Sequence, residues 1–174
     1  MILLFGLAGS GKSTQGQILA ERYNMKWLSA GQVLREHGGF ESQMKKGELV
    51  DDDTVIELML SEVKKAKAEG KDAILDGFPR DIYQAKKLVK KINGEIKKAI
   101  YLEVPRDELI KRINLRGRAD DTPEAVEKRF LIVEQNICSI LSLLKSKNIP
   151  VSRINGVGTI EEVAERVANE MENL

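Results

Sequence analysis

The stretch that decides the fold is Ile2–Ser13, which reads ILLFGLAGSGKS. Its first four residues are apolar, as in a buried strand of a parallel sheet, and a glycine-rich turn follows directly. Gly6 to Ser13 fit the pattern G-x-x-x-x-G-K-[ST] and lead into a segment of helical periodicity that ends near Tyr23. A strand, this loop and a helix in that order predict a phosphate-binding P-loop.

The chemistry of phosphate binding explains each residue type in this loop. Glycines let backbone N–H groups turn inward around an anion without steric conflict from a Cβ atom. The helix that begins near Lys12 directs the positive end of its dipole at the same anion. Lys12 is placed to reach the β and γ phosphates of a nucleotide, and the Ser13 hydroxyl is placed to bind Mg²⁺.

Four more short apolar runs predict further buried strands, and segments of helical periodicity lie between them: Lys26–Ser29, Ala73–Asp76, Ala99–Val104 and Val151–Ile154. Alternating strands and helices are typical of an α/β domain with a central parallel sheet. The clearest helix begins after Thr122, which fits an N-cap, with Pro123 at the first helical position. Its apolar residues recur at steps of three or four and predict a core-facing stripe of Val126, Phe130, Val133, Ile137, Leu141 and Leu144.

Length and composition bound the function classes. A chain of 174 residues suits one domain, and 28 Lys plus Arg against 27 Asp plus Glu leave a net charge of +1. We therefore expect no nucleic acid and no membrane as partner, because no bulk positive charge would drive such binding. No apolar run reaches the roughly 18 residues of a membrane span, and the first residues lack the basic region of a signal peptide. We expect a cytoplasmic protein and a monomer.

The chain has one cysteine, Cys138, and one histidine, His37. One cysteine excludes an intrachain disulfide, and the pair is too small a set for a cysteine or histidine zinc cluster, so we expect no zinc. We interpret Cys138 as a small buried residue of a helix. We interpret His37, beside two glycines, as part of a solvated loop.

Charged residues gather where parallel strands would end. Asp76 closes the third apolar run, which fits a carboxylate that contacts Mg²⁺ directly or through water. Six arginines follow predicted strands or lie in the segments that would overhang them: Arg35, Arg80, Arg112, Arg116, Arg118 and Arg129. Ligands bind at this edge of open α/β sheets, and guanidinium groups match phosphate oxygens in pairs. We therefore expect the arginines to neutralise phosphate groups during phosphoryl transfer.

These candidate residues include no clear general base for phosphoryl transfer. A hydroxyl acceptor would benefit from a carboxylate that takes its proton, whereas a phosphate acceptor already offers an anionic oxygen. This favours a nucleotide as acceptor. Asp76 could serve as a base, so a kinase that phosphorylates a small-molecule hydroxyl stays open. A switch that binds ATP without transferring phosphate also stays open, although it would not need arginines on the transferring group.

Four motifs in order carry a family resemblance over nearly the whole chain: Gly9-Ser10-Gly11-Lys12-Ser13-Thr14-Gln15, Leu28-Ser29-Ala30-Gly31 with Leu34-Arg35, Asp76-Gly77-Phe78-Pro79-Arg80 with Gln84, and Gly117-Arg118-Ala119-Asp120-Asp121 with Arg129. The sequence resembles the adenylate kinase family of nucleoside monophosphate kinases, in the form with a short lid. The resemblance implies a three-layer P-loop NTPase fold, with helices on both faces of a five-stranded parallel sheet. It implies one kinase domain over 1–174, with a nucleoside-monophosphate-binding insert at 30–59 and a short lid at 111–121.

The resemblance also implies roles for individual residues. The catalytic residues would be Lys12, Arg80, Arg118 and Arg129. ATP would contact Gly9, Ser10, Gly11, Lys12, Ser13, Thr14, Arg112, Arg116 and Gly158. AMP would contact Ser29, Ala30, Arg35, Val50, Gly77, Arg80 and Gln84. Ser13 and Asp76 would hold Mg²⁺, and Asp120 and Asp121 would fix the lid.

Two positions bear on the acceptor base. Relatives that act on AMP usually carry threonine where this chain has Ala30, whereas alanine is common in those that act on UMP or CMP. Gln84 favours AMP, because its amide offers a donor and an acceptor that match the N6/N1 edge of adenine. We predict an adenylate kinase that transfers the γ-phosphate of ATP to AMP, with a UMP/CMP kinase of the same fold as the alternative.

Overall fold

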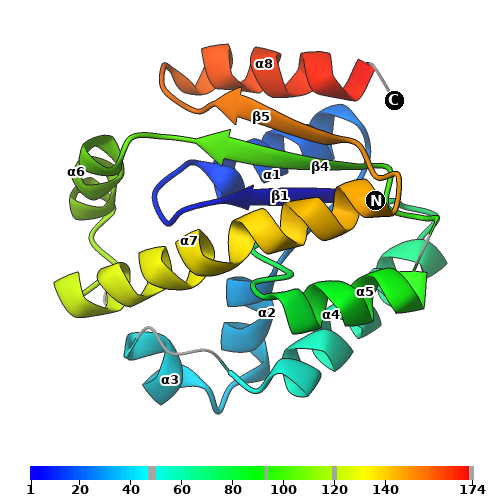
Figure 1. The fold of residues 1–174 in the computed structure, drawn as a ribbon, viewed down its shortest axis with the longest axis horizontal. Helices are drawn as coiled ribbons and strands as arrows, with labels where there is room; N and C mark the ends of the chain where they lie inside the picture. Colours follow the sequence, from blue (N-terminus) through cyan, green and yellow to red (C-terminus); the bar gives the residue numbers. More distant parts are fainter. Residues whose placement is uncertain (47–49, 93, 119–120, 173–174) are drawn as a thin grey trace.

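The computed structural model describes residues 1–46, 50–92, 94–118 and 121–172. The five strands are β1 (Ile2–Gly6), β2 (Lys26–Ser29), β3 (Ala73–Asp76), β4 (Lys98–Glu103) and β5 (Val151–Asn155). They form one sheet in the order β2-β3-β1-β4-β5, and every neighbouring pair is parallel. The predicted five-stranded parallel sheet is confirmed, and Figure 1 shows its strands β1, β4 and β5 side by side.

The described helices are α1 (Lys12–Arg22), α2 (Ala30–His37), α3 (Glu41–Lys45), α4 (Asp52–Ala68), α5 (Ile82–Ile92), α6 (Arg106–Arg116), α7 (Pro123–Ser146) and α8 (Ile160–Glu172). Helices α1 and α8 cover one face of the sheet, and α4, α5 and α7 cover the other. The two-sided cover gives the predicted three layers. None of the helices in the described part of the chain has the length and hydropathy that a membrane span requires.

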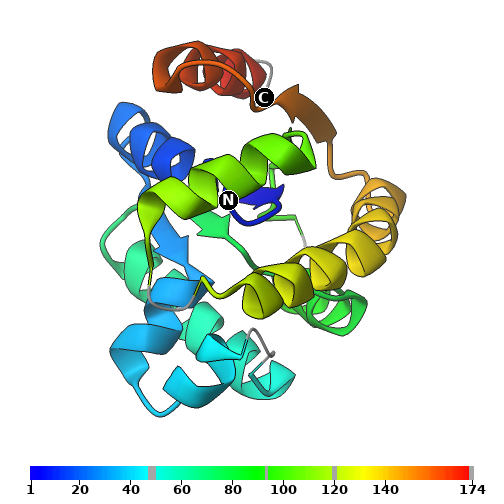
Figure 2. The same ribbon diagram turned by 90° about the vertical axis from the view of Figure 1, so that its left-hand side faces the viewer.

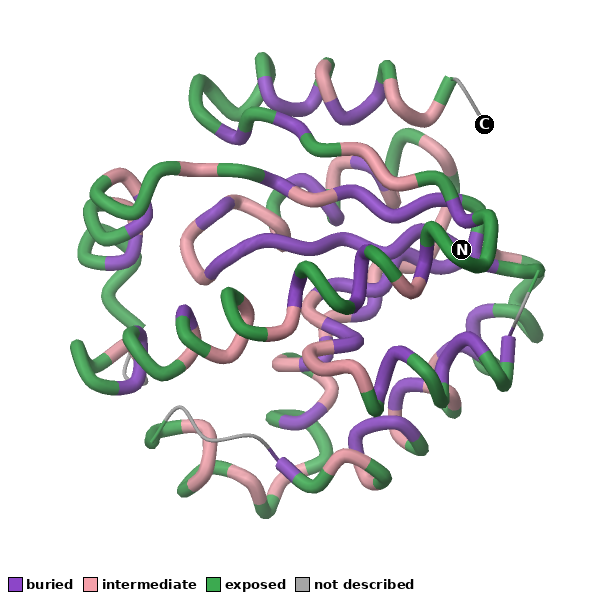
Figure 3. Tube along the Cα trace, viewed as in Figure 1, coloured by how far each residue is buried: buried purple, intermediate pink, exposed green. Residues whose placement is uncertain are grey.

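The alternation of side chains along β1 shows why both faces are covered. Ile2 and Leu4 pack against α1 and α8, whereas Leu3 and Phe5 pack against the helices of the opposite face. All four are buried, and Figure 3 shows the central strands buried along most of their length. A strand with apolar side chains on both faces needs a layer of helices on each face to shield those side chains from water.

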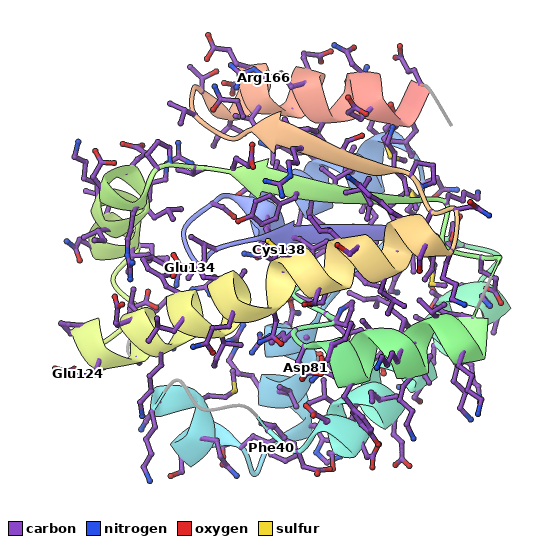
Figure 4. All side chains as sticks on the ribbon, viewed as in Figure 1. Phe40, Asp81, Glu124, Glu134, Cys138 and Arg166 are labelled. Atoms are coloured by element: carbon purple, nitrogen blue, oxygen red, sulfur yellow. The ribbon has the colours of Figure 1, made fainter. Side chains whose placement is uncertain are left out.

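Helix α7 begins as its sequence predicts. The Thr122 side chain accepts a hydrogen bond from the Ala125 backbone N–H at 3.2 Å, and Pro123 opens the helix. The predicted stripe faces the core, with Val133 the one member that is only half-buried. The prediction that Cys138 is buried was wrong, because the neighbouring Ile137 fills the core-facing position and a residue one step further turns to solvent (Figure 4).

The two interruptions of the strand–helix alternation differ in structure. The segment predicted as the acceptor insert comprises α2, α3 and the first part of α4, and exposed His37 ends α2 and does not lie in a loop. The segment predicted as the lid begins inside α6, which runs on to Arg116. Gly117 ends this helix in a left-handed conformation with φ of 57°, which glycine adopts readily.

Candidate active site

A cavity of about 840 Å³ opens at the carboxyl ends of β1, β2 and β3, where Gly6, Ser29 and Asp76 line it. Figure 2 looks onto this edge of the sheet, with α6 and the start of α7 around it and α2 and α3 beside it. Most of the predicted site residues line this one cavity: Gly9, Ser10, Gly11, Lys12, Ser13, Thr14, Ser29, Arg35, Val50, Asp76, Gly77, Arg80, Arg112, Arg116, Arg118, Arg129 and Gly158. Residues from separate motifs thus meet in space.

Helix α6 packs directly against the P-loop. Leu7 packs against Leu109 and Ile113 of that helix. Gly9 has a φ of 83°, and a Cβ atom there would lie 2.9 Å from the Leu109 carbonyl oxygen. Glycine is therefore required both by the backbone conformation and by the close approach of α6. Ser10 Oγ is buried and, among the described residues, has no hydrogen-bond partner.

Lys12 lies in an excess of positive charge. Its Nζ donates a hydrogen bond to the Leu7 carbonyl oxygen at 2.8 Å. Burial lowers the pKa of Lys12 from 10.5 to about 8, Asp76 opposes the shift, and nearby arginines, including Arg80 and Arg116, add to it. A phosphate anion at this point would relieve the repulsion, so the electrostatics favour an anionic ligand.

Ser13 and Asp76 meet beside the loop, although 63 residues separate them in the sequence. Ser13 Oγ donates a hydrogen bond to Asp76 Oδ2 at 2.8 Å, and Asp76 is only 3% exposed. A hydroxyl that donates its proton to a carboxylate keeps lone pairs for a cation, and Mg²⁺ prefers oxygen ligands. The pair therefore fits Mg²⁺. Among the described residues, no group of three His, Cys, Asp or Glu side chains could enclose a metal ion.

Three arginines from separate parts of the chain lie near one another in the cavity, on the side predicted to bind the acceptor: Arg35, Arg80 and Arg129. Arg80 follows β3 and donates from Nε to the Gly77 carbonyl oxygen at 2.9 Å. Burial lowers the pKa of Arg80, Asp76 opposes this, and the charges of Arg129 and Arg35 lower it further. Arginines brought this close together repel one another, which is the arrangement that a phosphate group would stabilise.

Asp121 holds two of the cavity arginines just before the start of α7. Its side chain is 4% exposed and accepts hydrogen bonds from Arg116 at 2.6 and 2.7 Å and from Arg129 at 2.9 Å. Burial alone would raise the pKa of Asp121, but the two arginines outweigh it and lower the pKa. Arg129 also donates to the Met44 carbonyl oxygen at 3.3 Å, which connects α7 with α3. Asp120 lies outside the described residues.

Arg112 lies at the end of the cavity that the sequence predicts to bind ATP. Its Nε donates to Glu108 at 2.9 Å, and Nη1 donates to the Gly156 carbonyl oxygen at 3.1 Å. Gly158 lines the same end, next to the start of α8. The contact fixes the guanidinium of α6 against the loop after β5, so these two distant segments form one wall.

Ala30 and Gln84 do not line the cavity in this structure. Ala30 is the first residue of α2, and it is buried in the core cluster. Gln84 is 1% exposed, and its amide is engaged by the protein: Nε2 donates to Asp52 Oδ1 at 2.8 Å, and Oε1 accepts from the Arg80 backbone N–H at 2.8 Å. The contact that Gln84 makes to an acceptor base stays a prediction.

The structure adds residues that the sequence did not single out. Trp27 and Glu108 line the cavity, and the carbonyl oxygens of Met44 and Gly156 accept hydrogen bonds from site arginines. A signal for Trp27 exists, because alternation along β2 puts it on the same face of the sheet as Ser29. The two carbonyl groups carry no signal in the sequence.

Comparison with known proteins agrees with this geometry. A family model described as "Adenylate kinase" matches residues 4–149. The chain is 32% identical to a protein of Parabacteroides distasonis named adenylate kinase, over 99% of this chain and 98% of that protein. It is 33% identical to one of Leptospira biflexa, over 95% and 96%, and 30% identical to one of Thermus thermophilus, over 95% and 94%. The chain belongs to the adenylate kinase family.

Proposed function

We propose that this protein is an ATP:AMP phosphotransferase, which moves the γ-phosphate of ATP to AMP reversibly and yields two molecules of ADP. The observation that carries the proposal is the meeting of two sets of phosphate-binding residues in one cavity. The P-loop with Lys12 forms one set, and Arg35, Arg80 and Arg129 form the other. Two such sets, facing the same space, suit a reaction between two phosphate groups.

The residues support this reaction by position and charge. Lys12 is next to the P-loop backbone and would neutralise the γ-phosphate of ATP as it leaves. Arg80 would hold the phosphate of AMP, and Arg118 and Arg129 would bridge the transferring group. AMP brings its own anionic oxygen as the nucleophile, so no side chain needs to accept a proton from it. Closure around the site would exclude water, which otherwise competes as acceptor.

Mg²⁺ bound together with ATP belongs to the proposal. The hydrogen-bonded pair of Ser13 and Asp76 supports it, because both side chains offer oxygen ligands beside the P-loop. The ion would supply charge neutralisation on the phosphate oxygens. Ser13 and Asp76 would orient it.

An assay of ADP formation tests the proposal. Purified protein is incubated with ATP, Mg²⁺ and one acceptor from a panel of AMP, CMP, UMP and small-molecule alcohols. We expect rapid formation of ADP with AMP and none with the alcohols. Binding of ATP without turnover of any acceptor would contradict the proposal and would favour an ATP-binding switch.

Arg80→Ala is expected to weaken use of the acceptor more than use of ATP. The Arg80 guanidinium is next to Arg35 and Arg129 on the acceptor side. Loss of one charged hydrogen-bonding group costs about 1.5–3 kcal/mol, which corresponds to a rise in the KM for AMP of about ten- to a hundredfold. Steady-state kinetics at saturating ATP measure this effect. An unchanged KM for AMP would show that Arg80 does not bind the acceptor.

The acceptor base is decided by competition between AMP, CMP and UMP. We expect AMP to give the highest kcat/KM, with measurable activity on CMP or UMP because alanine at position 30 lacks the hydroxyl of the threonine that relatives acting on AMP usually carry. Ala30→Thr should reduce this side activity and leave the use of AMP largely unchanged. Ala30→Val is the matched control, since valine has the shape of threonine without its hydroxyl. A wild-type preference for CMP or UMP would show that Ala30, and not Gln84, decides the choice of acceptor base.

A further inference from the structure

Trp27 makes a contact to Asp76 that the proposed reaction does not itself require. Its indole Nε1 donates a hydrogen bond to Asp76 Oδ2 at 3.3 Å. In the sheet, Ser29 is the register partner of Asp76, and Trp27 is the partner of Ile74. Trp27 and Asp76 are therefore diagonal neighbours on one face of the sheet, a separation that an aromatic side chain can bridge.

The hydrogen bonds of the Asp76 carboxylate are unevenly distributed. Oδ2 accepts from Ser13 Oγ at 2.8 Å and from Trp27 Nε1 at 3.3 Å. Within the described residues, Oδ1 accepts no hydrogen bond. Two donors on one oxygen limit rotation of the carboxylate about its Cβ–Cγ bond. Asp76 lines the cavity, and its Oδ1 keeps its lone pairs for a ligand.

Gly16 provides the space that Trp27 occupies. It lies within α1, and a Cβ atom built there would be 2.6 Å from Trp27 Cδ1 and 2.7 Å from Trp27 Nε1. Glycine inside a helix is less favourable than alanine, so its presence here needs a reason. The nearest other atom, Leu4 Cδ2 at 3.5 Å, would tolerate a methyl group. The indole is the neighbour that requires glycine.

We propose that Trp27 is a positioning residue for the metal site: its N–H holds the Asp76 carboxylate in the orientation that receives Mg²⁺ with the nucleotide, and Gly16 makes this contact sterically possible. The inference rests on the proposed function and extends it. Trp27 acts through Asp76, in the way that hydrogen bonds behind metal ligands orient them. The indole N–H of a partly buried tryptophan needs an acceptor, and here that acceptor is the metal-binding carboxylate.

A purely structural role for Trp27 makes a different prediction. The indole also packs against the apolar cluster between the sheet and α1, which contains Leu4 and Leu19. Loss of that packing would lower the melting temperature and leave the effect of Mg²⁺ on nucleotide binding unchanged. The decisive quantity is therefore the Mg²⁺ dependence of binding, not activity or stability.

Isothermal titration calorimetry with a non-hydrolysable ATP analogue measures this quantity. The Kd is determined with Mg²⁺ and with EDTA, and the ratio of the two values gives the gain due to Mg²⁺. Trp27→Phe removes the donor but keeps an aromatic ring. We expect it to reduce the gain about tenfold, with the Kd in EDTA unchanged. Trp27→Gln restores an N–H donor of similar reach and is expected to recover most of the gain.

Gly16→Ala tests the same contact from the opposite element. Its methyl group must displace the indole, so we expect a loss of the Mg²⁺ gain similar to that of Trp27→Phe. In the Trp27→Gln background, where no indole is displaced, the same substitution should leave the gain unchanged and raise the melting temperature. This matched pair separates displacement of Trp27 from any direct effect on α1.

Trp27 is the only tryptophan of the chain, so its fluorescence reports on the contact directly. In the wild type, addition of Mg²⁺ to protein saturated with the analogue is expected to change the emission, whereas Mg²⁺ without nucleotide is not. An unchanged emission, or an unchanged Mg²⁺ gain in both Trp27→Phe and Gly16→Ala, would overturn the inference. If the wild type itself formed no ADP from ATP and AMP, the proposed function would fail instead.

Discussion

Lys12→Met is expected to remove nearly all phosphoryl transfer while the protein becomes more stable at neutral pH. Removing one charged group that stabilises the transition state costs about a hundred- to a thousandfold in kcat. Methionine has a similar length and no charge, so it relieves the repulsion that Lys12 experiences beside Arg80 and Arg116. Assay of ADP formation and thermal unfolding of the same sample measure the two effects.

The gain in stability has a defined pH dependence. The pKa of Lys12 is about 8 in the folded protein against 10.5 in the unfolded chain. Below pH 8 the wild type carries the full cost of the buried charge, and this cost disappears as the pH rises from 8 to 10.5, because the folded state releases its proton first. The shift corresponds to about 3 kcal/mol before solvent screening, so we expect the mutant to gain on the order of 1–2 kcal/mol at pH 7.

Two outcomes would contradict this prediction. Normal turnover in a folded Lys12→Met protein would show that the P-loop lysine does not act on the phosphates. A stability difference from the wild type that is equal at pH 7 and pH 10 would show that the charge of Lys12 is not the cause. Lys12→Arg, which keeps a charge at both pH values, is the matched control.

Arg129→Ala is expected to lower kcat by about a hundred- to a thousandfold, with smaller changes in the KM values for ATP and AMP. Its guanidinium is held by Asp121 at 2.9 Å and faces the same cavity as Lys12. An interaction realised mainly in the transition state lowers kcat and kcat/KM together when it is removed. Steady-state kinetics with both substrates varied measure the split.

Arg129→Lys and Asp121→Asn are the controls for this experiment. Lysine keeps the charge but loses the planar fork, so an intermediate kcat is expected. Asp121→Asn keeps the size of the side chain but removes the negative charge that both Arg116 and Arg129 contact, so a fall in kcat reports on how Asp121 positions these two arginines. A fall in kcat for Arg129→Ala that is no greater than that for Asp121→Asn would show that Arg129 only supports the fold around Asp121.

The strands could be predicted closely because burial on both faces leaves a clear apolar signal. The bounds of β2 and β3 agree with the prediction, and β1 and β5 each extend one residue further, to Gly6 and Asn155. Strand β4 begins and ends one residue earlier than predicted, at Lys98 and Glu103. Hydrogen bonding to the neighbouring strands sets these ends, and hydropathy does not report it.

The site was predictable where a motif fixes local geometry and unpredictable where side chains from distant segments meet. The P-loop and the arginines could be assigned to one edge of the sheet from their positions after strands. The Asp52–Gln84 hydrogen bond joins residues 32 positions apart, and nothing in either segment specifies it. Cys138 shows a second limit of the sequence. The apolar pattern of a helix does not tell whether a residue next to its buried face is itself buried or exposed.

Under the proposed function, the hydrogen bonds of Asp121 would couple the binding of the two substrates. The series Arg116, Asp121 and Arg129 runs from the side predicted to bind ATP to the carbonyl oxygen of Met44, which lies in the segment predicted to bind AMP. Whatever free energy one nucleotide contributes to holding this series in place is free energy that the other does not need to supply. Linkage then requires that the factor by which ATP changes the affinity for AMP equal the factor by which AMP changes the affinity for ATP.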